Sequence, residues 1–266
     1  MTRVLSGAAL VVLTIGLVWF ATPLLFLLAG EALLVLGFVE YVSLARAVDI
    51  DLPAWPVGIG VASTAAALSS AAAGGGSPVA LEVVLMTAAV AIGALVLPRW
   101  RGGRDALPLA AASLFPILYL GLPVGALVAI REMRGPQGVF LLMLTVIVSD
   151  TAQYYTGRMF GRRPLAPAIS PKKTIEGAIG GFVFGTLLLA VAGHWWLPDV
   201  AWPIRSLLGA AVVALGIAGD LFESMLKRSA GVKDSSSLIP GHGGILDRID
   251  ALLFAAPIYY VVLKYV

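Results

Sequence analysis

The feature that most constrains this chain is a succession of apolar runs, each long enough to cross a bilayer as a helix. A helix needs about 20 predominantly apolar residues to span the hydrocarbon core. Glycine, proline or charged segments separate most of the runs. The sequence therefore predicts an all-α, polytopic membrane protein with nine transmembrane helices. The nine runs cover residues 4–21, 23–45, 55–73, 79–97, 106–130, 136–157, 175–197, 205–226 and 249–266.

Composition favours a membrane protein over a water-soluble one. Charged residues make up 12% of the 266 residues, whereas soluble domains average about 25%. The mean hydropathy is +0.96. The chain has no cysteine, which excludes disulfides and thiolate metal sites. Its two histidines are too few for a zinc site built on several imidazoles.

The first apolar run follows Arg3 and has the composition of a signal peptide. No small-x-small cleavage site follows it, and a second apolar run begins at once. We therefore expect it to be an uncleaved first span.

Basic residues predict how the chain crosses the membrane, because cytoplasmic loops carry an excess of Lys and Arg. With nine spans, the N-terminus and the loops after the even-numbered spans share one side. Fourteen of the 18 basic residues fall on that side. We therefore predict an N-terminus inside and a C-terminus outside. The basic residues on the other side are Arg131, Arg134, Arg205 and Lys264.

Acidic residues within apolar runs are costly and usually functional. Asp220 ends one such run, and Glu223, Ser224 and Lys227 follow it at helical spacing on one face. A salt bridge between Glu223 and Lys227 would explain those two residues but would leave Asp220 unpaired. Among the other acids, Glu40 and Glu82 are interpreted as reaching the interface from run ends. Glu31 lies deeper, and a structural or a functional role for it is left open.

The polar segment continues to Asp250 and combines acids, bases and glycines. Glycines let a backbone approach a ligand closely and present its amide groups. Asp247 and Asp250 could merely favour the N-terminus of the last helix. Beside Asp220, however, they form a set of hard oxygen ligands suited to Mg²⁺, and nearby bases suit phosphates. This pattern indicates phosphoryl or nucleotidyl transfer. The segment contains Lys227-Arg228, Lys233-Asp234, Pro240-Gly241-His242-Gly243-Gly244 and Asp247-Arg248-x-Asp250.

A second polar segment lies on the same predicted side. Asp150 and Arg158 end the sixth run, and the paired lysines Lys172 and Lys173 follow. Ser170 and Pro171 fit a helix start, whereas the paired lysines suit a phosphate or an anionic headgroup. No Walker A loop, G-x-G-x-x-G motif or Ser-His-Asp set is present.

The two segments together resemble the phosphatidate cytidylyltransferase family of bacterial type. The resemblance covers residues 140–266, and Gln153 departs from it where a small residue is expected. Its longest motif is Ser224-x-Leu226-Lys227-Arg228, then Lys233-Asp234-x-Ser236-x-x-Ile239-Pro240-x-His242-Gly243-Gly244-Ile245-x-Asp247-Arg248-Ile249-Asp250. Shorter matches are Asp150-Thr151-Ala152-x-Tyr154, Gly157-Arg158-x-Phe160-Gly161 and Ser170-Pro171-Lys172-Lys173-Thr174-x-Glu176-Gly177.

This resemblance implies an enzyme of the cell (inner) membrane that makes CDP-diacylglycerol and pyrophosphate from CTP and phosphatidate. It implies Mg²⁺ as cofactor, leaves open a second cation such as K⁺, and points to a homodimer with its active site facing the cytoplasm. No nucleic-acid partner is expected. Residues 1–135 would form a membrane scaffold with a dimer contact, and residues 136–266 the catalytic domain.

The resemblance also assigns roles to individual residues. The metal ligands would be Asp220 and Asp247, with Asp250 beside them. The groups expected to act on the triphosphate, besides Asp220 and Asp247, are Lys227, Arg228, Lys233 and Arg248. Substrate contacts are expected from Asp150, Arg158, Lys172, Lys173, Ser224, His242, Gly243 and Gly244.

Two other functions remain to be separated from this one. A CTP-dependent polyprenol or phytol kinase would transfer the γ-phosphoryl group to an alcohol. A transporter would carry charges near the middle of the membrane in both halves of the chain. Here the charges gather at one face and in the C-terminal half, which favours the transferase.

Overall fold

The computed structural model describes residues 2–72, 79–100, 102–103 and 105–266, and side chains from residue 6 onward except that of Ala72. Apart from one short hairpin, the regular elements of the described residues are helices, which confirms an all-α fold. The helices are α1 (Thr2–Phe20), α2 (Pro23–Ala47), α3 (Ala54–Ala72), α4 (Leu81–Val96), α5 (Ala106–Pro116), α6 (Leu122–Phe160), α7 (Ile175–Trp196), α8 (Trp202–Ser229) and α9 (Leu246–Tyr265). A 3₁₀ turn, η1 (Leu97–Arg99), follows α4, and a π-helical turn, η2 (Ile117–Gly121), joins α5 to α6.

Five helical segments of the described chain are long and apolar enough to cross a membrane, which supports a multi-pass membrane protein. The first apolar run forms α1, and its part from Ser6 to Phe20 is apolar as well. The predicted number of nine spans stays a prediction. The five segments are Pro23–Ala47, Leu81–Arg99, Ala106–Phe160, Ile175–Trp196 and Trp202–Ser229.

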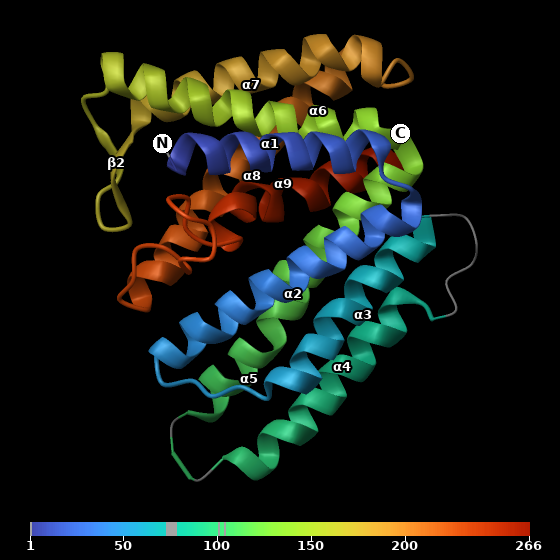
Figure 1. The fold of residues 1–266 in the computed structure, drawn as a ribbon, viewed down its shortest axis with the longest axis vertical. Coiled ribbons are helices and arrows are strands. Elements are labelled where there is room, and N and C mark those ends of the chain that lie inside the picture. The colour runs from blue at the N-terminus through green and yellow to red at the C-terminus, as the bar shows by residue number, and fades with distance from the viewer. Residues whose placement is uncertain (1, 73–78, 101, 104) are drawn as a thin grey trace.

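The helices run in two main directions, and a bend in α6 joins them (Figure 1). One group contains α2, α3, α4, α5 and the start of α6, and the other contains α1, the rest of α6, α7 and α9, with α8 passing obliquely behind them. The bend lies at Gly135, whose φ of 69° is non-helical and precedes Pro136. The predicted domain boundary falls at this bend, and the division into domains stays a prediction.

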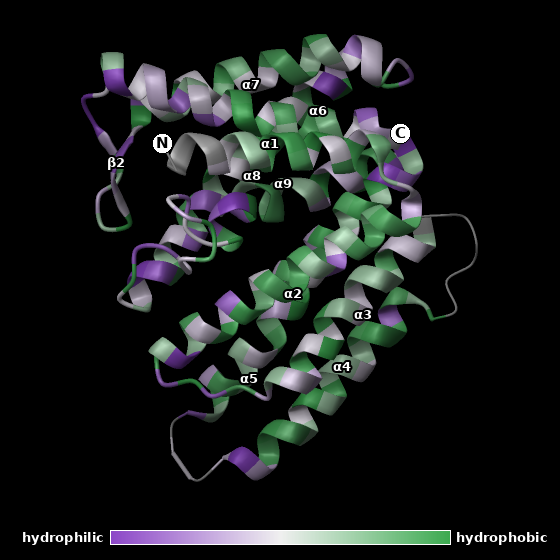
Figure 2. Ribbon diagram, in the orientation of Figure 1, coloured by the Kyte–Doolittle hydropathy of each residue, from purple (hydrophilic) through white to green (hydrophobic). Residues whose placement is uncertain are grey.

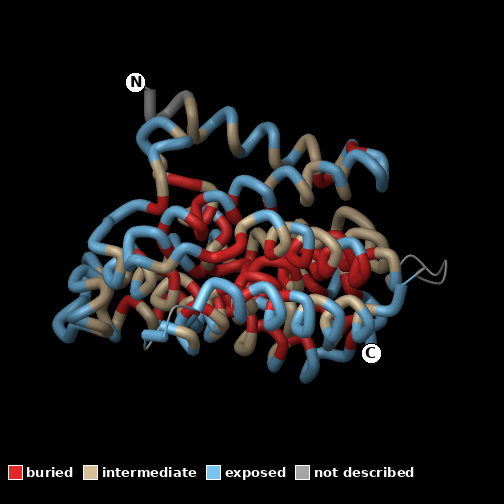
Figure 3. The backbone as a smooth tube through the Cα atoms, turned by 90° about the horizontal axis from the view of Figure 1, so that it is seen from below, coloured by how far each residue is buried: buried red, intermediate tan, exposed pale blue. Residues whose placement is uncertain are grey.

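Buried residues run through the centre of the molecule, and exposed residues cover its outside (Figure 3). One core cluster joins α2, α3, α5 and η2 to the start of α9. A second cluster joins α6, α7, α8 and α9. Many large apolar side chains are exposed on the helix surfaces, as expected where lipid rather than water surrounds them.

Close packing of α6 on α7 explains how the chain accommodates Gln153. A Cβ on Gly181 would collide with the Gln153 side chain, so the glycine leaves the space that Gln153 occupies. The amide Nε2 of Gln153 donates to Asp150 Oδ1 at 2.9 Å. The larger residue therefore packs without displacing the helix and touches the predicted site.

The hairpin of β1 (Pro164–Ala166) and β2 (Ser170–Thr174) corrects the predicted helix start at Ser170. The helix begins five residues later, where Thr174 Oγ1 accepts a hydrogen bond from Gly177 N at 3.1 Å. The Glu176 carboxylate accepts from Arg162 N at 3.0 Å and Arg163 N at 3.3 Å. These contacts fold the segment back and leave Lys172 and Lys173 on a strand.

Candidate active site

Hydrophilic segments gather at the hairpin, at the end of α8 and in the loop that leads to α9 (Figure 2). All three lie on the same side of the molecule. The two polar segments that the sequence singled out are therefore neighbours in space, although β2 and the last turn of α8 are about 50 residues apart.

An ion pair connects the two polar segments directly. Lys173 Nζ on β2 pairs with Asp220 Oδ2 on α8. Both side chains are about a quarter exposed, with relative areas of 22% and 28%. Ser224 Oγ lies 3.5 Å from the other oxygen of Asp220. Asp220 on α8 is thus paired with a lysine of the hairpin, because β2 brings the Lys173 side chain to it.

Lys227 occupies the centre of a second, deeper cluster. Its Nζ pairs with Glu223 one turn earlier and also with Asp247 Oδ1 at the start of α9. Glu223 is 0% and Lys227 is 8% exposed. The simple salt bridge considered from the sequence does form, but Lys227 also holds α8 to α9. Glu223 Oε1 is buried and accepts no hydrogen bond from the described residues.

Asp247 organises the loop that precedes α9. Its Oδ2 accepts from Gly244 N at 2.8 Å, Ser235 N at 2.9 Å and Ser235 Oγ at 2.8 Å. Gly243 has a φ of +76°, and a Cβ there would collide with this carboxylate. The glycines predicted to approach a ligand instead approach the chain's own carboxylate.

Two further acids lie close to this cluster. Asp250 accepts from Ala251 N at 2.8 Å and is within electrostatic reach of Asp220, Glu223 and Asp150. Asp150 in turn is influenced by Asp220 and Lys173. Five carboxylates are therefore grouped around two ammonium groups. When all five are ionised, the cluster carries excess negative charge, which a cation or protons must balance.

Other predicted site residues lie at the edge of this cluster. Lys172, Lys233 and Arg248 are exposed. Arg228 donates to the carbonyls of Ile169 and Val232, which braces the hairpin against the end of α8. Arg158 Nη1 donates to Tyr154 Oη at 3.2 Å.

His242 faces α1 rather than the carboxylates. Its Nδ1 lies 3.0 Å from Ser6 Oγ, and that hydroxyl donates to Pro240 O at 3.1 Å. The tip of the loop therefore rests on the first helix, and the structure provides no contact between His242 and the acid cluster.

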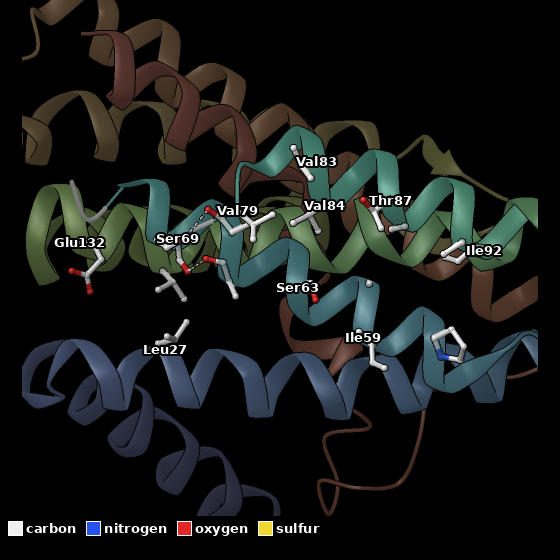
Figure 4. A pocket seen from close by; sticks show the side chains of 18 of the residues that line it. Leu27, Ile59, Ser63, Ser69, Val79, Val83, Val84, Thr87, Ile92 and Glu132 are labelled. Atoms are coloured by element: carbon white, nitrogen blue, oxygen red, sulfur yellow. Dashed lines mark hydrogen bonds between the residues drawn. The ribbon is translucent and has the colours of Figure 1, made fainter. Parts of the chain in front are cut away.

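A separate cavity of about 910 Å³ lies between α2, α3, α4 and α6 (Figure 4). Leu27, Ile59 and Val83 are among its apolar lining residues, and Glu132 and Ser69 are among the polar ones. None of the charged residues of the α8 and α9 cluster lines it. The cavity is thus distinct from the candidate active site.

Comparison with known sequences decides the family. A model described as "Cytidylyltransferase family" matches residues 1–266. The chain belongs to the cytidylyltransferase family.

Individual bacterial proteins are similar to part of this chain. Phosphatidate cytidylyltransferase of Aquifex aeolicus is 38% identical over 151 residues, covering 57% of this chain and 56% of that protein. The Synechocystis protein of the same name is 48% identical over 134 residues, covering 48% and 45%. That of Haemophilus influenzae is 46% identical over 129 residues, covering 46% and 45%. The matched part spans about half the length of these relatives.

The family resemblance implies Mg²⁺ at the acid cluster. No three His, Cys, Asp or Glu side chains of the described residues are close enough together to form a metal site as they stand. Two of the three predicted ligands, Asp220 and Asp247, pair with lysines instead. The donor set nonetheless suits a hard cation, because it consists of carboxylates with excess charge and an unpaired oxygen on Glu223.

The sequence interpretation missed one residue of the site altogether. Glu40 is buried within the protein, with 4% of its surface exposed, against the loop before α9. The sequence contained one indication of this contact, because the predicted topology places Glu40 and this loop on the same membrane face.

Proposed function

We propose that this cytidylyltransferase transfers the cytidylyl group of CTP to phosphatidate, giving CDP-diacylglycerol and pyrophosphate. The observation that carries the proposal is the paired arrangement of Lys173 with Asp220 and of Lys227 with Asp247 at one end of the helices. It provides ammonium groups for phosphates and carboxylates for a cation, next to helix faces that lipid can cover. The names of the similar bacterial proteins support the same substrates.

The proposed reaction needs positioning more than acid–base chemistry. A phosphate monoester is largely ionised near pH 7, so an oxygen of phosphatidate can attack the α-phosphorus of CTP without a strong base. The new O–P bond forms as the bond to the β-phosphate oxygen breaks, and pyrophosphate leaves. Lys173 and Lys227 would stabilise charge on the phosphates during this exchange. A reaction that needs no strong base fits a site in which His242 contacts Ser6 of α1 and not the carboxylates.

We propose that Mg²⁺ binds at Asp220, Asp247 and Asp250. Binding of a second cation such as K⁺ is left open. When bound, Mg²⁺ would neutralise the CTP phosphates and favour departure of pyrophosphate. The exposed Lys172, Lys233 and Arg248 would attract the anionic substrates to the cluster. Arg158 and Ser224 keep their predicted substrate roles and Arg228 its predicted role at the triphosphate, and the homodimer likewise stays a proposal.

The labelled-substrate experiment tests the reaction itself. Purified protein with phosphatidate and Mg²⁺ is expected to place the label of [α-³²P]CTP, but not of [γ-³²P]CTP, into lipid. Chelation with EDTA should abolish this transfer. Lipid labelled from the γ-position would instead establish the lipid kinase, and absence of any labelled lipid would favour the transporter.

We further propose nine spans with the N-terminus and the active site in the cytoplasm and the C-terminus outside. The absence of native cysteine allows a direct test with single cysteines. Ser237 lies in the loop before α9 and Pro198 lies between α7 and α8, and both are exposed. A membrane-impermeant maleimide on intact cells is expected to label Pro198→Cys but not Ser237→Cys. Labelling of Ser237→Cys but not of Pro198→Cys would show the reverse orientation in the membrane.

A further inference from the structure

Glu40 of α2 is a buried carboxylate outside the motifs that carry the family resemblance. It belongs to the N-terminal half of the chain, and 4% of its surface is exposed. No lysine, arginine or histidine of the described residues forms an ion pair with it. A buried charge without a cationic partner must be stabilised by hydrogen bonds, since desolvation is otherwise costly.

Four donors from the loop before α9 supply those hydrogen bonds. Oε1 accepts from Ser236 Oγ at 2.7 Å and Ile245 N at 2.9 Å. Oε2 accepts from Ser235 Oγ at 2.8 Å and Leu246 N at 2.9 Å. Each carboxylate oxygen therefore joins one serine hydroxyl to one backbone amide.

The two amides belong to the residue before α9 and to the first residue of α9, and no side chain of this turn caps the helix. Its N-cap residue is Ile245, which forms no side-chain cap hydrogen bond. The first amides of a helix need an acceptor, and a negative charge there is favoured by the helix dipole. Glu40 supplies this acceptor from 205 residues away in the sequence. The orientation of the first turn of α9 thus depends on α2.

Ser235 links Glu40 to Asp247. Its hydroxyl lies 2.8 Å from Glu40 Oε2 and 2.8 Å from Asp247 Oδ2. One hydroxyl has a single proton, so the two carboxylates share it. Gly244 packs against the same groups, because a Cβ there would collide with Ser235 Oγ and with both Glu40 oxygens. Glu40 and Asp247 therefore form one network with the loop between them.

We propose that Glu40 is a positioning residue, which sets the first turn of α9 and thereby holds Asp247 against Lys227. Its catalytic consequence rests on the proposed cytidylyl transfer, whereas its structural consequence does not. Residues that hold a site's charged groups in place typically change activity about 10- to 100-fold when replaced. The N-terminal half of the chain would therefore contribute to the site and not only to the scaffold.

The decisive variant is Glu40→Gln, which keeps the shape but removes the charge. Its amide nitrogen cannot accept, so the two donors that faced one carboxylate oxygen lose their acceptor. We expect faster amide hydrogen exchange in the segment containing Ile245 and Leu246. We also expect kcat to fall about 10- to 100-fold with a smaller change in the KM for CTP. Glu40→Asp retains the charge and should recover part of this loss.

A matched control and a double variant separate positioning from general damage. Glu82→Gln removes an exposed glutamate of α4 and should leave exchange and kcat unchanged. Glu40→Gln combined with Ser235→Ala should cost no more than the worse single variant, because both break one network. Additive losses, or loss of thermal stability with kcat unchanged in the folded fraction, would overturn the proposal.

The exchange measurement keeps the inference separate from the proposed reaction. If the wild-type protein makes no CDP-diacylglycerol, the reaction is wrong, while the exchange comparison still tests Glu40. If the wild-type protein is active and Glu40→Gln matches it in both exchange and turnover, the positioning role is wrong and the reaction stands.

Discussion

Replacing Asp247 with asparagine is expected to lower kcat for cytidylyl transfer by about 10²- to 10³-fold, the loss typical when one preorganised group that supports transition-state charge is removed. Asp247 pairs with Lys227 through Oδ1 and accepts three loop hydrogen bonds through Oδ2. Asparagine removes the charge that balances Lys227 and one of the two oxygens. A proposed metal ligand and the order of the loop are thus lost in one change. Transfer from [α-³²P]CTP to phosphatidate measures the effect.

The control for this variant is another aspartate on the same predicted side. Asp51→Asn changes a side chain that is 85% exposed and weakly paired with Arg46 at 3.8 Å. It should keep wild-type turnover. If Asp247→Asn elutes as a folded protein and keeps full turnover, then the assignment of this cluster to catalysis is wrong.

The positions of the helices could be predicted from the sequence because lipid exposure demands unbroken apolar runs. The third run was predicted at residues 55–73, and α3 spans Ala54–Ala72. The closeness of the two polar segments was also predictable, since both lie at the same predicted membrane face, whereas the ion pair of Lys173 with Asp220 was not predicted. Sidedness restricts such residues to a plane, which makes their encounter much more probable than in a soluble chain.

Contacts that depend on tertiary structure could not be predicted. The local pattern at Ser170 and Pro171 suits a helix start, but pairing with β1 and the hydrogen bonds of Glu176 make it a strand. Local propensity is a weak prior that such contacts override. Glu40 was misinterpreted for a related reason, because its donors lie about 200 residues away and α9 has an isoleucine where a cap is expected.

Replacing Lys227 with methionine is expected to lower the free energy of unfolding by about 3–5 kcal/mol. Methionine preserves the volume of the side chain but removes its charge. Glu223 and Asp247 would then face each other without their common cation, and the Glu223 and Asp247 side chains are 1% and 6% exposed. Water cannot solvate them there, so the penalty is that of an uncompensated buried charge. Unfolding in mixed detergent–SDS micelles measures the loss.

Two further variants show whether charge is the cause. Lys233→Met removes an exposed lysine from the neighbouring loop and should change the free energy of unfolding by less than about 1 kcal/mol. Adding Glu223→Gln to Lys227→Met removes one of the two stranded carboxylates and should restore part of the stability without restoring turnover. A Lys227→Met protein as stable as Lys233→Met would show that the two acids do not need this cation. In that case the excess charge of the cluster would have to be balanced by the bound cation or by protons alone.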